Sequence, residues 1–168
     1  QGRNLARVNG VEDKCRFEVA NASEMPYADQ SFDIVVYHEV LHHAIKYPNV
    51  REETLRVLKP GGRVVVSETL RGNALLSLAR RISMRGEEAK GDVILELKDL
   101  SGFAGGFSAY RIEPMSLFFM LKRAFQNRTH NPLVRVLLRS IKLVDDAVLY
   151  AFPSLRKMCG ECVMVMRK

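Results

Sequence analysis

The most informative stretch of the chain is Arg56-Val57-Leu58-Lys59-Pro60-Gly61-Gly62. Apolar residues spaced for one helix face predict a helix over residues 48–59, and Pro-Gly-Gly ends that helix because it cannot continue it. The apolar segment 64–67 that follows predicts a strand. The apolar run 34–37, before the helix, is typical of a strand buried in a parallel sheet. The order strand, helix, strand therefore predicts an α/β fold.

The remaining elements are predicted from apolar spacing and from helix breakers. Residues 71–110 differ in composition from the rest, with an amphipathic pattern at 75–82 and a glycine-rich stretch at 101–107 that is typical of a lid or a mobile connection. A chain of 168 residues with 47% hydrophobic residues can bury one core, so we expect a single domain over residues 1–168. Apolar patterns predict four further elements, which are a strand at 15–19, helices at 114–125 and 132–150, and a strand at 162–166.

Composition limits the class of protein. No run reaches the roughly 18–20 apolar residues that a membrane-spanning helix needs. The chain begins at Gln1, inside what reads as the tail of a helix, so we expect a fragment and draw nothing from the lack of a signal peptide. Three cysteines without a framework spacing favour a reducing compartment, which predicts a cytoplasmic protein.

The net charge of +7 is unevenly distributed. Residues 111–142 hold seven basic side chains against one acidic side chain, Glu113. Such a segment can attract nucleic acid, anionic lipid headgroups or an acidic substrate, or it can be a solvated helix face. Basic and aromatic residues do not interleave as base stacking requires, so we expect no nucleic-acid partner. Peripheral membrane contact through residues 111–142 stays open, and the sequence does not set an oligomeric state.

The motifs together resemble the class I S-adenosylmethionine-dependent methyltransferases, particularly the type 11 group that includes quinone-biosynthesis methyltransferases. The Pro26 to Asp33 motif, the Leu41-His42-His43 motif and the Arg56 to Gly62 motif occur there in this order and spacing. The resemblance covers residues 15–70 firmly and the rest loosely. It implies a doubly wound, Rossmann-like sheet whose first strands, including the one with the glycine-rich cofactor loop, are not in this chain.

The resemblance also implies a function. We expect the C-terminal part of an enzyme that uses S-adenosylmethionine to methylate a small-molecule, lipid or glycan-precursor acceptor, with the isolated fragment inactive. The alternative is a non-catalytic, truncated binding module. The range 71–110 corresponds to the place where the family commonly carries a lid on the substrate side.

Two loops that follow predicted strands are the expected cofactor contacts, because ligands in open α/β sheets bind beyond the carboxyl ends of the strands. The family has an acidic side chain at position 21 that accepts from the adenine amino group, with the next backbone N–H on the ring. Asn21 can still accept that hydrogen bond, and Ala22 and Ser23 follow it. An ordinary asparagine turn is the alternative. Tyr37 and His38 end the second strand, where the family loop touches the methionine part of the cofactor.

Three histidines near that loop are candidate catalytic residues: His38, His42 and His43. A histidine beside the acceptor could remove a proton as the methyl group is transferred. Many methyltransferases, however, need only hold the nucleophile, methyl group and sulfur in line. Packing or helix capping would explain His42 and His43 equally well.

Two short patterns suggest metal chemistry. His38-Glu39-x-x-His42 is the pattern of zinc metalloproteases, which requires both histidines on one helix. Because the pattern begins at the end of a predicted strand, we expect no metal site. Cys159-Gly160-Glu161-Cys162 is a lone C-x-x-C motif, for which packing of two small apolar side chains is favoured over zinc or redox use.

Overall fold

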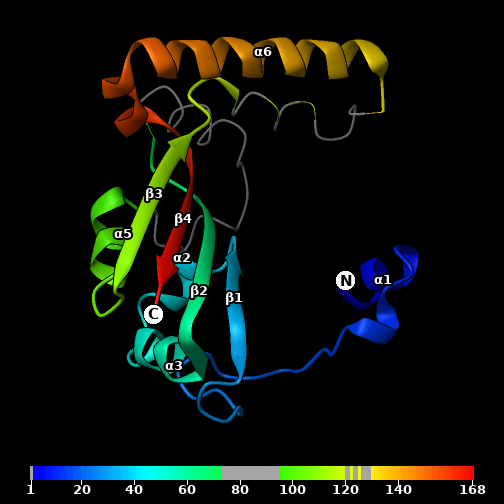
Figure 1. The fold of residues 1–168 in the computed structure, drawn as a ribbon. Coiled ribbons are helices and arrows are strands. Elements are labelled where there is room, and N and C mark those ends of the chain that lie inside the picture. Colours follow the sequence, from blue (N-terminus) through cyan, green and yellow to red (C-terminus); the bar gives the residue numbers. More distant parts are fainter. Residues whose placement is uncertain (1, 73–94, 120–121, 123–124, 126–129) are drawn as a thin grey trace.

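The computed structural model describes residues 2–72, 95–119, 122, 125 and 130–168. Its four strands form one mixed sheet in the order β1-β2-β4-β3. β1 and β2 run parallel, whereas β4 is antiparallel to both of its neighbours, as Figure 1 shows. The predicted α/β class is confirmed. The strands are β1 Phe32–His38, β2 Leu58–Thr69, β3 Ala109–Met115 and β4 Glu161–Arg167.

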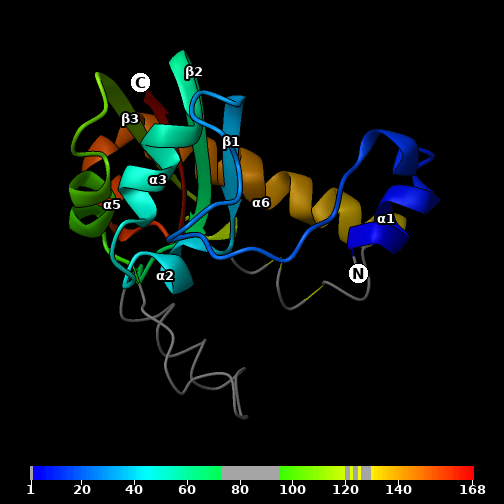
Figure 2. The ribbon, with the colours of Figure 1, turned by 90° about the horizontal axis from the view of Figure 1, so that it is seen from below.

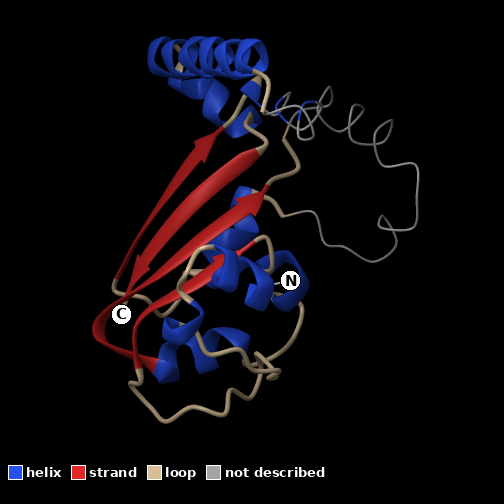
Figure 3. Cartoon of the chain, turned by 90° about the vertical axis from the view of Figure 1, so that its right-hand side faces the viewer, coloured by secondary structure: helices blue, strands red, loops and turns tan. Residues whose placement is uncertain are grey.

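The described helices are distributed unevenly around this sheet. They are α1 Gly2–Val8, α2 Leu41–Ala44, α3 Val50–Val57, α5 Leu97–Phe103 and α6 Pro132–Ala151, with short 3-10 helices at Glu12–Lys14 and Pro153–Met158. Figure 3 shows the short helices gathered on one side of the sheet and the long α6 across its end. α1 stands away from the sheet in Figures 1 and 2.

The core fills the space between the sheet and the short helices. Side chains of β2 and β4 alternate between this covered face and the opposite face, as a strand period of two requires. On the opposite face Ile34 and Val36 of β1 are 57% and 62% exposed. The core therefore lies on one side of the sheet, and its central members are Tyr37, Leu41, Val50, Val64, Val66, Leu100, Phe103, Met164 and Met166.

Pro60-Gly61-Gly62 does more than end a helix. α3 ends at Val57, and the chain enters β2 directly, so the glycines lie inside the strand. The register passes from Phe32 opposite Leu58 to Ile34 opposite Arg63, which marks an irregularity in the ladder. Gly61 has a φ of +74°, and a Cβ on Gly62 would come within 2.9 Å of the Lys59 carbonyl oxygen. Only glycine fits this close approach of backbone to backbone.

The predicted strand at residues 15–19 is wrong. Residues 15–20 have no regular structure, and Val19 is fully exposed while Phe17 is 40% exposed. An apolar alternation forms a strand only when a neighbouring strand accepts its backbone hydrogen bonds. In the described part of the chain no strand pairs with residues 15–19, and the outer edge of β1 is not used for this purpose.

The predicted helix at residues 114–125 is also wrong at its start. Residues 109–115 form β3, which pairs antiparallel with β4 from Ala109 opposite Arg167 to Met115 opposite Glu161. Pro114 is tolerated because β3 lies at the edge of the sheet. The backbone hydrogen bonds between β3 and β4 thus outweigh the helical spacing of the apolar residues in this segment. Most of residues 120–129 lie outside the described residues.

Two other predicted elements are confirmed by the structure. The helix at 132–150 and the strand at 162–166 are confirmed as α6 and β4. Within the range 71–110, residues 73–94, with the predicted helix at 75–82, lie outside the described residues. Leu100 and Phe103 of α5 are buried in the core, so the described end of this range is built into the domain.

Candidate functional site

Glu68 organises the carboxyl end of β2. Its side chain is completely buried, and one carboxylate oxygen accepts hydrogen bonds from the backbone N–H groups of Val40 and Leu41. The other oxygen lies 2.8 Å from Nδ1 of His42. Three donors therefore converge on one buried carboxylate, which is how a buried charge is accommodated.

The turn between β1 and α2 is held by the same end of β2. Glu39 has a φ of +50°, and its backbone N–H donates to the carbonyl oxygen of Ser67 at 2.9 Å. The hydroxyl of Thr69 donates to the Glu39 carboxylate at 2.9 and 3.0 Å. The turn is thus fixed at both its backbone and its side chain, and it places α2 at the carboxyl edge of the parallel pair.

His42 is positioned for proton chemistry. Its side chain is 17% exposed, and the buried Glu68 carboxylate faces its Nδ1 atom. A carboxylate only accepts hydrogen bonds, so the proton of a neutral His42 ring is held on Nδ1 and Nε2 keeps its lone pair. The ring of the exposed His43 stacks at a tilt, with its centroid 4.0 Å from that of His42.

The structure separates His38 from His42. His38 is the last residue of β1 and is exposed, while His42 belongs to α2. Along β1 its side chain alternates with Tyr37, so His38 lies on the open face of the sheet and Tyr37 on the covered face. The His38-Glu39-x-x-His42 pattern therefore does not lie on a single helix. In the ranges that the structure describes, no group of three or more His, Cys, Asp or Glu side chains could hold a metal ion.

Tyr37 contributes to the core. Its hydroxyl lies 2.6 Å from the hydroxyl of Thr54, and its ring meets Phe103 edge to face. Burial raises the pKa of Tyr37 above its ordinary value of 10.0. Any contact between Tyr37 and a ligand at the sheet edge would therefore involve its backbone.

Asn21, Ala22 and Ser23 form a turn. The Asn21 side-chain oxygen accepts from the Ser23 backbone N–H at 3.0 Å, which is the ordinary asparagine turn considered from the sequence. Ala22 packs against the main core. The Asn21 side chain is exposed and its oxygen retains a second lone pair, so it keeps the capacity to accept another hydrogen bond.

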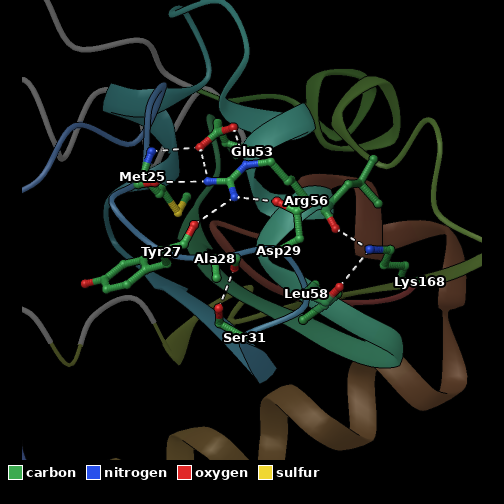
Figure 4. Close-up of polar contacts among 10 residues, drawn as sticks. Met25, Tyr27, Ala28, Asp29, Ser31, Glu53, Arg56, Leu58 and Lys168 are labelled. Carbon is green, nitrogen blue, oxygen red and sulfur yellow. Dashed lines mark hydrogen bonds and ion pairs between the residues drawn. The ribbon is translucent and has the colours of Figure 1, made fainter.

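The loop that follows this turn is tied to α3 by Arg56. The guanidinium donates to the carbonyl oxygens of Met25 and Tyr27 and to the Asp29 carboxylate, as Figure 4 shows. It also forms two hydrogen bonds with Glu53, each 2.8 Å long. These contacts hold Glu53 ionised, because hydrogen bonds from Arg56 and from the Met25 backbone lower the pKa of Glu53 to about 2.

Sequence reasoning treated Arg56 only as part of a motif. The planar guanidinium of Arg56 carries five N–H donors, and this explains the residue type, because one lysine ammonium could not bind two carbonyl oxygens and two carboxylates in this fixed geometry. Lys168 adds a second tie at this end, donating to the carbonyl oxygens of Leu55 and Leu58 at 2.6 and 2.7 Å. Two features of the sequence could have indicated this role of Arg56, namely its position one helical turn after Glu53 and the Met25-Pro26 segment.

The two cysteines of the C-x-x-C motif are both buried and free. Burial raises the pKa of Cys159 to about 11 and that of Cys162 to about 12, so both thiols stay protonated near neutral pH. Their packing role is confirmed. Cys15 is exposed.

Comparison with known proteins matches residues 2–66 to the methyltransferase domain family. Over 66 residues the chain is 39% identical to the methyltransferase GfsG of Streptomyces halstedii, which covers 39% of this chain and 24% of that protein. It is 36% identical over 67 residues to the ubiquinone/menaquinone biosynthesis C-methyltransferase UbiE of Vibrio campbellii (strain ATCC BAA-1116), covering 40% and 26%. The chain thus matches about a quarter of the length of these curated relatives.

A solved structure extends the likeness to the whole fold. A methyltransferase of Thermotoga maritima, described as a possible histamine N-methyltransferase, superposes with a TM-score of 0.59 at 13% identity. The match covers 96% of this chain and 69% of that protein. At this identity the likeness concerns the fold alone, and it confirms a Rossmann-like methyltransferase sheet.

Proposed function

We propose that this chain, whose residues 2–66 match the methyltransferase domain family, is part of a class I S-adenosylmethionine-dependent enzyme that methylates a small-molecule or lipid-like acceptor. The observation that carries the proposal is the convergence of Val40, Leu41 and His42 on Glu68 at the carboxyl end of β2. This is the sheet edge at which open α/β folds bind their ligands. A buried charge there, paired with a histidine, has the character of a functional site.

S-adenosylmethionine, when bound, supplies a methyl group activated by a positively charged sulfur. The chemistry of the Asn21–Ser23 turn and of the backbone at the end of β1 suits parts of such a molecule. The exposed amide of Asn21 and the hydroxyl of Ser23 can hydrogen-bond adenosine groups, and the backbone at the end of β1 can face its amino-acid part. We propose that Asn21, Ala22, Ser23, Tyr37 and His38 contribute in this way, with Tyr37 acting through its backbone.

His42 is the proposed proton acceptor. An oxygen or nitrogen acceptor must lose a proton as it forms its new bond to carbon, and the lone pair on Nε2 of His42 can take that proton. The Glu68 carboxylate then faces the resulting imidazolium through Nδ1 at 2.8 Å and stabilises its charge. Glu68 is therefore a positioning residue that acts through His42. His43 and His38 are secondary candidates: His43 is exposed beside the His42 ring, and His38 is exposed at the end of β1.

The acceptor class and the location of the protein are further parts of the proposal. The name of UbiE refers to quinone lipids, and this supports a lipid-like acceptor. Three free cysteines, two of them buried, support a cytoplasmic location. A binding module without catalysis is the second candidate, because the hydrogen bonds of Glu68 to Val40 and Leu41 also fix the turn after β1, and a purely structural role would explain them.

A transfer assay tests the proposal. The full-length enzyme that contains this chain would be incubated with S-adenosylmethionine carrying a tritiated methyl group and with separate pools of phenolic quinol lipids, sterols and hydroxylated small molecules. We expect label in one pool, a loss of about a hundredfold in rate for His42→Gln, and a much smaller loss for His43→Gln. Saturable cofactor binding with no transfer to any pool would favour the binding module instead.

A further inference from the structure

The apolar side chains of α6 do not all point toward the rest of the protein. Only Asp145 and Leu149 of this 20-residue helix are buried, and Asp145 accepts hydrogen bonds from the backbone N–H groups of Leu117 and Phe118. A helical period of 3.6 residues places Val134, Leu138 and Ile141 on the same inward side. These three side chains are half-buried, so this inward face accounts for less than half of the helix's apolar residues.

The outward face of α6 is apolar and uncovered. Among the described residues of the helix, the members of this face are Leu133 (77% exposed), Val136 (60%), Leu137 (45%), Leu143 (69%), Val144 (55%) and Tyr150 (87%). At 100° per residue they occupy one continuous sector, in which Ser140 is the only polar residue besides the Tyr150 hydroxyl. A solvated helix normally has charged residues on its outer side, so this sector needs another explanation.

Basic residues flank one edge of that sector. Arg135 and Arg139 are four residues apart and both exposed, and neither forms an ion pair with a described residue. Lys142 continues the row and pairs with Asp146 at 2.7 Å. An apolar sector bordered by cations is complementary to a surface that is apolar inside and anionic outside. Within the described ranges no helix is both long and apolar enough to cross a membrane.

The position of α6 connects this face to the candidate active site. In Figures 1 and 3 the helix lies across the end of the sheet with its long axis transverse to the strands. This is the end at which β1 and β2 stop, because the backbone N–H of Leu70, just after β2, donates to Gly160, just after the 3-10 helix that follows α6. A surface held against α6 would therefore lie at the end of the sheet that carries Glu68 and His42.

We propose that the outward face of α6 docks on an anionic phospholipid surface. The apolar sector enters the boundary between headgroups and acyl chains, and Arg135 and Arg139 meet lipid phosphates at its edge. Tyr150 and Phe152, which is 61% exposed, supply aromatic rings of the kind favoured at such boundaries. The earlier expectation of contact through residues 111–142 is thereby moved to α6, because Arg111 pairs with Glu113 and Lys122 with Glu161.

A second copy of the chain is the main competitor for this face, and charge disfavours it. In a symmetric antiparallel pair of helices the same edge of each helix comes together, so the row Arg135, Arg139 and Lys142, in which Asp146 is the one acidic residue, would face the same net positive row of the second helix. Like charges at such a seam are destabilising. An anionic surface meets the same arginines with opposite charge.

Vesicle flotation tests the proposal. The protein would be mixed with two sets of vesicles of equal size. One set contains phosphatidylcholine alone, and the other contains phosphatidylcholine with about 30 mol% of the anionic lipid phosphatidylserine. We expect binding to the anionic vesicles that weakens with salt. The double variant Leu133→Gln with Leu143→Gln should lose about tenfold or more in partition coefficient. Arg135→Gln with Arg139→Gln should lose about tenfold.

Matched controls use exposed apolar and exposed basic residues elsewhere in the chain. Leu5→Gln with Val8→Gln removes two exposed apolar side chains from α1, and Lys14→Gln with Lys46→Gln removes two exposed charges. Both control variants should bind as the unchanged protein does, and circular dichroism should show all four variants folded.

Equal binding by the α6 variants and their controls would overturn the proposal, as would an absence of binding to anionic vesicles. A dimer in analytical ultracentrifugation that the Leu133 and Leu143 changes dissociate, without lipid binding, would assign the face to a second copy. Because every readout is lipid binding or mass, the result does not depend on whether methyl transfer is found.

Discussion

The two ends of the β1–β2 pair are each organised by one glutamate, and the two glutamates are used differently. Glu53, near the amino end of β2, is bound by the guanidinium of Arg56 and the backbone N–H of Met25. Glu68, at the carboxyl end, is buried with two backbone donors and His42 as its partners. The first arrangement neutralises a carboxylate with a permanent cation, whereas the second pairs it with a side chain that can gain and lose a proton.

The comparison distinguishes structural from functional use of the same residue type. Arg56 cannot be deprotonated in a protein, so its contact with Glu53 can only hold the Met25–Asp29 loop in place. Glu68 holds a turn as well, but its second oxygen is committed to a titratable ring. Both ends carry a glutamate, but only Glu68 has a histidine as its partner. We therefore assign proton transfer to the carboxyl end of the β1–β2 pair.

The largest effect is expected from Glu68→Gln. The glutamine oxygen can still accept from Val40 and Leu41, but its NH₂ group would face Nδ1 of His42 and favour the proton on Nε2. That tautomer lacks the lone pair needed to accept a proton, so we expect methyl transfer to fall by about a hundredfold or more. The pH profile of kcat should also change, which a purely structural role would not cause. Rates within threefold of the unchanged protein would contradict the assignment.

Glu53→Gln is the control for that prediction. It alters a carboxylate of the same strand–helix unit without touching His42, so it should change thermal stability and leave the pH profile of transfer unaltered. If both variants lost activity equally, the distinction between the two ends of the sheet would be wrong.

The next effect is on stability, at the Pro60-Gly61-Gly62 bulge. A Cβ on Gly62 would lie 2.9 Å from the Lys59 carbonyl oxygen and 3.0 Å from that of Asp33, and backbone cannot yield cheaply. We expect Gly62→Ala to lower the free energy of unfolding by about 2–4 kcal/mol in urea titrations. The matched change Gly102→Ala, in α5 with nothing within 4 Å, should be neutral or stabilising by up to about 1 kcal/mol. Equal effects at the two glycines would contradict this explanation of the bulge.

A smaller effect concerns pH. The pKa of Glu53 is lowered from its ordinary 4.5 to about 2, so its contribution to stability is complete above about pH 4.5 and is lost as the pH falls toward 2. The melting temperature of Glu53→Gln should therefore be lower than that of the unchanged protein at pH 7. The difference should narrow between pH 4.5 and 2. A difference that stays constant across this window would show that the charge of Glu53 is not what Arg56 recognises.

The smallest effect is expected at Asn21. Asn21→Asp keeps an oxygen that can accept from the Ser23 backbone N–H, so stability should change by less than about 0.5 kcal/mol. Asn21→Leu removes that acceptor and should destabilise the turn by about 1 kcal/mol. Calorimetric titration with S-adenosylmethionine should show the aspartate variant binding at least as well as the unchanged protein. The leucine variant should bind more weakly than the unchanged protein, and equal affinity of the two would remove Asn21 from the proposed cofactor contacts.

The sequence predicted those parts of the fold in which local pattern and tertiary pairing agree. Ile34 to Tyr37, the helix before Pro60 and the strand at Cys162 to Met166 are of this kind. Prediction failed at residues 15–19 and 109–115, where the presence or absence of a neighbouring strand decides the outcome and no local pattern reports it.

The candidate site was predicted only in outline. The resemblance led to His42 and its neighbours, but Glu68 lies 26 residues further on and was not among the predicted site residues. Its burial depends on how β2 is placed beside the turn after β1, which the spacing along the chain does not reveal. The role of Arg56 was missed for the same reason, because its partners lie up to 31 residues away.

The most direct test of the central claim is to map where S-adenosylmethionine contacts the protein. Ultraviolet cross-linking with the tritiated methyl donor is followed by trypsin digestion and by sequencing of the labelled peptide. Within peptide 17–46, sequencing distinguishes the turn at Asn21 and the His42 loop from the Met25–Asp29 loop, and digestion separates this peptide from those around Glu53 and Arg56. We predict saturable label in peptide 17–46 that excess S-adenosylhomocysteine prevents. Label confined to residues 47–63, or no saturable label, would contradict a methyl-transfer site at the carboxyl ends of β1 and β2.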